Sequence, residues 1–370
     1  MSTLQPATRH RRMEYLDALR FVLALATMAW HYYYFGPRTH LIDAPAGGAS
    51  VLRYLSFTVE VFFVISGFVI AASAVNRKPL DFLIGRIVRL APCVLICATI
   101  TVALCVHTRF GALPRDYLKS VLVVPLTWVG GVDASYWSLR FELFFYGFIL
   151  VAMCVCDLER RMFRLALALI AYDLATIALG ASHIDPEWLA VLTHPIGHYA
   201  PFFAIGMLFY LMFVKKDTGL GVMLALLVAM ACAVFRCYQE ANRISGVVGD
   251  GRTSVVVAGA IVAAILLTFV AAALVSRASP WPRLFGLLGK ASYPLYLVHQ
   301  NLGFRLINLF THDHPLSFDV RPLLMLGMVV VAIVIARWFE PLVAAIYKRV
   351  LVAATAPLRA VRLPAMRGAR

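Results

Sequence analysis

Charged side chains are scarce in this sequence: they make up 14% of its 370 residues, whereas 62% of the residues are hydrophobic. An ordinary soluble domain carries about 25% charged residues, so this chain has too little polar surface for a soluble fold. Its apolar residues come in repeated runs of about 20, the length that crosses the hydrocarbon of a bilayer as a helix. The composition therefore excludes a soluble globular protein and predicts an integral membrane protein.

The seven cysteines provide no disulfide framework, because six lie inside apolar runs and Cys237 stands at the end of another. We interpret them as small residues packed between helices, not as disulfide partners or zinc ligands. His194 and His198 have the i, i+4 spacing of helical metal ligands, but no carboxylate motif completes a set. The sequence therefore predicts no metal site and no permanently bound cofactor.

The chain has no internal repeat and no loop long enough for a separate soluble domain. This predicts one transmembrane domain over residues 1–350 and a basic cytoplasmic tail over residues 351–370. The apolar stretch Leu118–Val129 is too short to span, and we interpret it as a re-entrant or interfacial segment. The predicted fold class is an all-α bundle of about ten spanning helices, at about 15–35, 51–75, 87–107, 137–156, 163–181, 198–214, 219–237, 254–276, 291–310 and 322–347.

The formal net charge of +15 would suggest nucleic-acid binding in a soluble protein. Here most of the 34 Lys and Arg side chains lie in the tails and in alternate loops, on the side of the N-terminus. Enrichment of this kind predicts that both termini are cytoplasmic. The basic tail is expected to lie against anionic lipid headgroups, and nucleic acid is excluded as a partner.

Ionisable residues within a spanning helix are costly and point to function, and the first helix carries two. Arg20 and His31 are eleven residues apart, which on an α-helix places them within about 20° of the same face and about 16 Å apart. Asp17 is spaced to pair with Arg20. The alternative for His31 is an interfacial aromatic belt with Trp30 and its tyrosine neighbours.

Carboxylates and guanidiniums recur in the next helices. Glu60 lies within the second helix without an intrahelical partner, so it is expected to face the interior of the bundle. Arg86 and Arg89 share a face at the cytoplasmic start of the third helix, where two guanidiniums can bind phosphate oxygens. The alternative is simple anchoring by positive charge. Glu142, in the fourth helix, is expected at a depth similar to that of His31, where the two would suffice for general-base chemistry.

The ninth predicted helix carries Tyr293, Tyr296 and His299, followed by a polar stripe that begins at Asn301. Such a stripe in a membrane usually lines a cavity, and His299 is expected to face the same space as Glu60. Two other spacings indicate structural ion pairs, Arg236 with Glu240 and Arg337 with Glu340.

Five of these elements, in this order, resemble the motifs of the acyltransferase-3 family of membrane acyltransferases. The resemblance spans nearly the whole chain, with Glu60 where Asp is usual and Arg140 where a small or neutral residue is more common. The matching segments are Tyr15–Arg20 followed by His31, then Val59–Phe68, Arg86–Arg89 with Pro92, Tyr136–Glu142 and Ser292–Gln300.

The resemblance implies transfer of an acyl group, usually acetyl from acetyl-CoA as co-substrate, to a hydroxyl of an extracytoplasmic or lipid-linked carbohydrate. Arg20, Arg86 and Arg89 would bind the acyl-CoA, and its pantetheine arm would carry the thioester to His31, the general base. Glu142 or Glu60 would orient that base. The acceptor would contact Glu60, Trp137, Ser138, Tyr293, Tyr296, His299 and Asn301. We expect such an enzyme in a bacterial inner membrane.

A transporter or flippase of a lipid-linked sugar is the alternative, because it also needs many helices, buried charges and a polar cavity. Carriers with inverted repeats tend to show broken helices at matching positions in two halves. The sequence shows no such pairing, which favours the acyltransferase.

Overall fold

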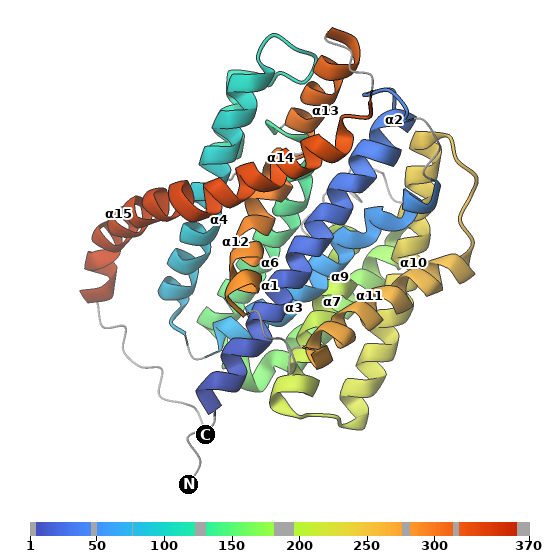
Figure 1. Cartoon of the computed structure of the whole chain (residues 1–370). Helices are drawn as coiled ribbons and strands as arrows, with labels where there is room; N and C mark the ends of the chain where they lie inside the picture. Colours follow the sequence, from blue (N-terminus) through green and yellow to red (C-terminus); the bar gives the residue numbers. More distant parts are fainter. Residues whose placement is uncertain are drawn as a thin grey trace.

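The computed structural model describes residues 5–45, 50–75, 77–122, 131–180, 196–275, 282–313 and 318–360 (Figure 1). Every regular element within these ranges is helical, which confirms the predicted all-α fold class. The longer helices are α1 Gln5–Trp30, α3 Thr58–Ala74, α4 Pro79–Cys105, α6 Trp137–Val155, α7 Leu158–Gly180, α9 Ala200–Tyr210, α10 Leu220–Val248, α11 Val255–Val275, α12 Pro282–Val298, α14 Arg321–Val334 and α15 Glu340–Ala360.

Short segments extend or join these helices. The 3₁₀ turns are η2 Ser50–Phe57, η3 Ala134–Tyr136 and η4 Gly197–Tyr199, and the short α-helices are α2 Gly36–Arg38, α5 Pro114–Val121 and α13 Asn301–Asn308. The π-helical turns are η1 His31–Phe35, η5 Leu211–Lys215, η6 Leu309–Asp313 and η7 Ile335–Phe339. The predicted re-entrant segment begins within α5, and the rest of it, from residue 123, lies outside the described residues.

Seven helical stretches in the described part of the chain are long and apolar enough to cross a membrane. Two further apolar helices, Val255–Ala271 and Leu284–Val298, are shorter. The chain is therefore a polytopic helical membrane protein, as the composition predicts. Nine of the ten predicted ranges overlap one helix or one continuous run of helical segments, and the ninth overlaps two helices that a turn separates.

The centre of the bundle is built by α1, α3, α9 and α12. Helix α1 packs against α12 and α3, and α3 packs against α9, whose residues are all buried. The last of these contacts is close because glycines face each other: a Cβ on Gly67 would collide with the backbone of Phe203, and one on Gly206 with that of Val64. Small residues permit such an approach between helices in a membrane.

Several helices begin or end well away from the predicted positions: α1 and α12 begin earlier, α15 ends later, and α4 and α10 bear on the site. Helix α4 starts at Pro79, with proline at its first position and Asp81 in its first turn, both of which favour helix initiation. Arg86 and Arg89 therefore lie well inside α4 and not at its start. Helix α10 continues to Val248, although its predicted end is residue 237.

The ninth predicted helix is divided into α12 and α13 by a turn at His299 and Gln300. The break leaves two backbone carbonyls for side-chain donors: Tyr32 donates to the carbonyl of His299, and Ser135 donates to that of Tyr296. At the other end of the chain, α14, η7 and α15 form one helical run of which only a small part is buried; Figure 1 shows α15 extending away from the bundle.

Candidate active site

A cavity of about 460 Å³ lies between α1, α3, α4, α6 and α12. Its lining residues on α3 run from Val59 to Ile70, and eleven residues of helix correspond to about 16 Å. The cavity is therefore long, extending along much of α3. Four cationic side chains and two acidic ones, Asp17 and Glu142, line it; the cations are Arg20, Arg86, Arg89 and Lys290.

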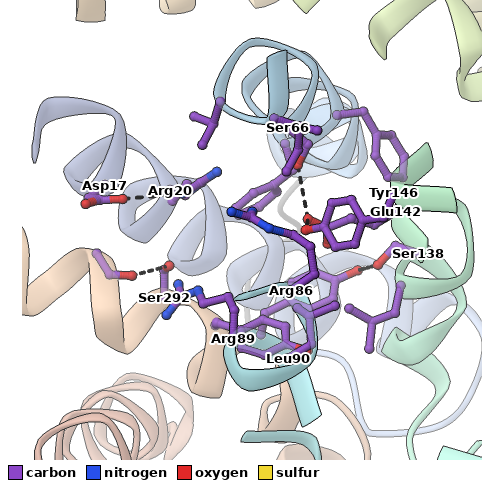
Figure 2. Close-up of a pocket in the computed structure, with 18 of the residues that line it drawn as sticks. Asp17, Arg20, Ser66, Arg86, Arg89, Leu90, Ser138, Glu142, Tyr146 and Ser292 are labelled. Atoms are coloured by element: carbon purple, nitrogen blue, oxygen red, sulfur yellow. Dashed lines mark hydrogen bonds and ion pairs between the residues drawn. The ribbon is translucent and has the colours of Figure 1, made fainter. Parts of the chain in front are cut away.

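The cations of this larger cavity are only partly neutralised. Arg20 forms an ion pair with Asp17 at 3.3 Å, and Arg89 forms one with Glu340 of α15 at 3.5 Å. Arg86 stands over the ring of Tyr146, and its Nε atom is buried with no hydrogen-bond partner among the described residues. Figure 2 shows the side chains of Arg20 and Arg86 directed into the space beside Glu142. An excess of positive charge in a low-dielectric cavity attracts anions such as phosphates.

A second cavity, of about 240 Å³, lies where α1, α6, α10 and α12 approach the start of α3. His31, Glu60 and Trp137 line it, together with Glu240 and Arg243 of α10. Glu60 is 4% exposed, and its Oε2 atom has no hydrogen-bond partner in the described part of the chain. A buried carboxylate oxygen without a partner at a cavity wall is available to a ligand hydroxyl.

The π-helical turn at the end of α1 places His31 against α12. The Nδ1 atom of His31 lies 3.0 Å from the carbonyl oxygen of Thr27 and 3.0 Å from Nε2 of His299. His299 is fully buried, and its own Nδ1 lies 2.7 Å from the carbonyl oxygen of Tyr296. Turns of π-helix are frequent at functional sites.

This pattern assigns the protons of the two neutral imidazoles. His299 donates from Nδ1 to Tyr296, so its Nε2 is an acceptor. His31 then carries its proton on Nδ1, which faces both Thr27 and His299. The Nε2 atom of His31 is left with its lone pair, the state that a general base requires.

The two cavities adjoin, because Val59 and Tyr296 line both of them. Arg20 lines the larger cavity and His31 the smaller, so the two residues of α1 face two neighbouring cavities. A long cationic cavity that ends beside the cavity of a buried histidine can bring an anionic carrier molecule and a base together.

The model of the acyltransferase-3 family, an acyltransferase domain, matches residues 13–337, most of the chain. The chain belongs to this family. It is accordingly an O-acyltransferase, as the five motifs predict. No curated protein and no solved structure matches the chain.

Most of the site residues predicted for the acyltransferase line one of the two cavities or both. Tyr296 lines both, and three, His31, Glu60 and Trp137, line the smaller cavity. The larger cavity contains Arg20, Arg86, Arg89, Ser138, Glu142 and Tyr293.

Three predicted placements differ from the structure. Glu142 does not share the cavity of His31; it accepts hydrogen bonds from Ser66, at 3.3 Å, and from Tyr146. His299 contacts His31 but is not among the residues that line the cavity of Glu60. Asn301 is bonded instead to the loop before α6, through the Asp133 carboxylate and the Val132 carbonyl. The spacing of residues on one helix predicts how deep each side chain lies in the membrane and which face of the helix carries it. Which residue it contacts depends on how the neighbouring helix packs.

Both predicted local ion pairs are replaced by other partners. The buried Arg236 donates to Asp173 of α7 at 2.8 Å, and Glu240 binds Arg243 through two hydrogen bonds. Glu340 pairs with Arg89 of α4. A buried guanidinium gains more from a partner inside the bundle than from an i, i+4 neighbour at the surface, because the interior screens charge less.

The sequence analysis did not predict some residues that line the two cavities or support His31. Glu240 and Arg243 line the smaller cavity because α10 extends past its predicted end. Their i, i+3 spacing was the one local pattern that could have indicated an ion pair on a longer helix. The contact of His31 with His299 joins residues 268 positions apart, which no local pattern indicates. The sequence analysis predicts no metal at His194 and His198. His198 lies 3.1 Å from Arg236, and His194 lies outside the described residues. Among the described residues, no three His, Cys, Asp or Glu side chains form a metal-binding group.

Proposed function

We propose that this enzyme transfers an acyl group, acetyl in the simplest case, from acyl-CoA in the larger cavity to a carbohydrate hydroxyl in the smaller cavity. The observation that carries the proposal is the junction of the two cavities. A cationic space about 16 Å long ends next to the cavity that contains His31. An extended pantetheine arm is of comparable length, so its thioester would reach the junction while its phosphates stay among the arginines.

The donor end is supported by the arginines of α1 and α4. Arg20, Arg86 and Arg89 converge on one cavity from two helices, and the buried Nε of Arg86 is available to an incoming phosphate. Guanidinium groups bind phosphate through two parallel hydrogen bonds, which gives orientation as well as affinity. We expect the nucleotide of CoA at the end of the cavity marked by Asp17 and Lys290.

The acceptor end is supported by aromatic and carboxylate side chains. Trp137 is 41% exposed and lines the smaller cavity with Glu60 and the Glu240–Arg243 pair. Carbohydrates bind to such walls, the ring face against an aromatic side chain and the hydroxyls against planar polar groups. His31 removes the proton of the acceptor hydroxyl through Nε2, and the hydroxyl oxygen then attacks the acyl carbon.

The proposal also assigns each cavity to one side of the membrane. In the arrangement that the sequence predicts, with about ten spans and cytoplasmic termini, the Arg20 end of α1 faces the cytoplasm, where acyl-CoA is made. The smaller cavity then faces the outside, where an extracytoplasmic or lipid-linked glycan arrives. The proposed location is a bacterial inner membrane.

The test is mass spectrometry of surface carbohydrate from a deletion strain that carries wild-type, His31→Ala or His312→Ala protein. Acylation is expected with the wild type and with His312→Ala, which removes an exposed histidine outside both cavities. Loss of acylation in His31→Ala, with normal membrane insertion, would support the assigned base. Acylation that persists in that variant would overturn it.

A transporter of a lipid-linked sugar is the competing function, because it too would need a polar path through the bundle. Reconstituted vesicles separate the two. The acyltransferase joins labelled acetyl from acetyl-CoA to the acceptor, whereas a transporter changes the side of the membrane on which the sugar stands and leaves its mass unchanged.

A further inference from the structure

Acyl transfer needs more than a base: negative charge develops on the carbonyl oxygen of the thioester when the acceptor attacks. Enzymes stabilise that charge with hydrogen-bond donors fixed before the reaction begins. In the proposed function the thioester comes from the larger cavity and the acceptor from the smaller. The carbonyl carbon is attacked from one side and loses its sulfur on the other, so it must lie at the junction of the two cavities.

Only Val59 and Tyr296 are shared by the described linings of both cavities, and Val59 has an apolar side chain. Donors such as Tyr293 and Ser66 line the larger cavity alone, and Gln300 lines the smaller one alone. Of the two shared side chains, the Tyr296 hydroxyl is therefore the one able to donate a hydrogen bond at the junction.

The structure holds this hydroxyl firmly. Tyr296 is 8% exposed, and its Oη shares a hydrogen bond of 2.8 Å with Oγ of Ser138 on α6. Its ring packs edge-on against Phe62 of α3, with 6.0 Å between the ring centres. The phenol is therefore fixed between three helices, and only its proton has to turn toward a substrate.

The same residue also supports the base. Its carbonyl oxygen accepts a hydrogen bond from Nδ1 of His299, and His299 in turn contacts His31. One turn of α12 thus orients the general base through its backbone and presents a hydroxyl donor through its side chain.

We infer that Tyr296 is a catalytic residue that donates a hydrogen bond from Oη to the thioester carbonyl oxygen as it becomes an oxyanion. The inference rests on the proposed function. His31 Nε2 takes the proton of the acceptor hydroxyl, whose oxygen forms the new bond to the acyl carbon while the carbonyl π electrons move to oxygen. When the tetrahedral intermediate collapses, the carbon–sulfur bond breaks and the CoA thiolate takes the proton from His31.

Ser138 is the partner that this role requires. Either hydroxyl can donate in the hydrogen bond between Tyr296 and Ser138; we assign Tyr296 as the donor because Ser138 can donate to the carbonyl of Ser135, at 3.4 Å. When the oxyanion forms, the Tyr296 proton turns to it, and Ser138 donates to the phenol oxygen. Ser138 is then a positioning residue, whose loss weakens the donor without removing it.

The test is steady-state kinetics of purified full-length protein in detergent, with acetyl-CoA and a soluble carbohydrate acceptor. Tyr296→Phe is expected to lower kcat by about 10²–10³, the loss typical of one oxyanion donor, with little change in the KM for acetyl-CoA. Ser138→Ala is expected to lower kcat by about tenfold, and adding it to Tyr296→Phe should cost little more.

Tyr117→Phe is the matched control. It also removes a phenol that shares a hydrogen bond with a hydroxyl, that of Thr99 at 2.9 Å, but it lies outside both cavities. Its kcat should equal that of the wild type. Thermal unfolding and acetyl-CoA binding confirm that each variant is folded.

Three outcomes decide the matter. A folded Tyr296→Phe protein with wild-type kcat overturns the inference and leaves the proposed function intact. Equal losses in Tyr296→Phe and Ser138→Ala also overturn it, because they show that the hydrogen bond serves only to hold α12 against α6. If the wild-type protein transfers no acetyl group to any carbohydrate, the proposed function itself fails.

Discussion

The Nε2 atom of His299 lies 3.0 Å from the Nδ1 atom of His31, so the turn between α12 and α13 supports the end of α1. Both rings are almost completely buried, which leaves the contact nearly free of competition from water. The carbonyl of Tyr296 fixes the proton of His299, and His299 in turn fixes that of His31.

Replacement of His299 should therefore slow catalysis without weakening substrate binding. We expect His299→Ala to lower kcat by about 10–100-fold, less than the 10²–10⁴-fold contribution of a general base itself, with KM values nearly unchanged. His299→Gln should recover part of the loss, because its amide oxygen can accept the proton of His31. Steady-state kinetics with varied acetyl-CoA checks this; a rise in KM alone would mean that His299 binds substrate instead.

The buried Nε of Arg86 predicts a specific effect on the donor. Arg86→Lys keeps the positive charge but loses the two-pronged geometry, and a hydrogen bond to a charged group contributes about 1.5–3 kcal/mol. The dissociation constant for acetyl-CoA should rise by about 10–100-fold. Arg160→Ala, which removes an exposed arginine paired with Asp157, is the control and should bind acetyl-CoA normally. Unchanged binding in Arg86→Lys would place the phosphates elsewhere.

The crossing of α3 and α9 should tolerate no added methyl group. In Gly206→Ala the new Cβ would press on the Val64 carbonyl and approach within 2.7 Å of the Phe68 nitrogen. Overpacking of this kind destabilises by about 1–3 kcal/mol, and thermal unfolding in detergent should show a clear fall in Tm. Gly147→Ala adds the same methyl group inside α6 where no atom lies within 4 Å, and it should leave Tm unchanged or raise it, because alanine favours a helix over glycine. Equal Tm values for both variants would contradict the packing argument.

Stability should also depend on pH through Asp133, in the loop just before the span that begins at Ala134. Burial raises the pKa of its carboxyl to about 6, although hydrogen bonds from Ser135 and Asn301 oppose the shift. The folded protein therefore holds this proton more tightly than the unfolded chain, whose Asp pKa is about 3.9. Between about pH 4 and pH 6 the folded state binds more protons, so stability falls as pH rises, by about 3 kcal/mol in total.

Denaturant unfolding in detergent at several pH values measures this slope. Asp133→Asn should be flatter than the wild type over the same interval, whatever its absolute stability. If the slope persists undiminished in Asp133→Asn, another group is responsible.

Several features of this protein followed from the sequence because they depend on composition or local spacing. The apolar runs predicted a helical membrane protein, since only helices or closed barrels satisfy the backbone in lipid. Five ordered motifs predicted the acyltransferase family. The eleven-residue spacing of Arg20 and His31 predicted two positions along one path, and these residues line adjoining cavities.

Only the tertiary structure decided which side chains meet. Glu142 was expected at a depth similar to that of His31 and was one of two candidates, with Glu60, to orient it; in the structure it bonds to Ser66 and Tyr146 within the larger cavity. Depth is a property of one helix, whereas contact depends on how neighbouring helices rotate and cross. The sequence could place Tyr296 on a polar helix, but the junction it occupies exists only where α3, α6 and α12 pack together.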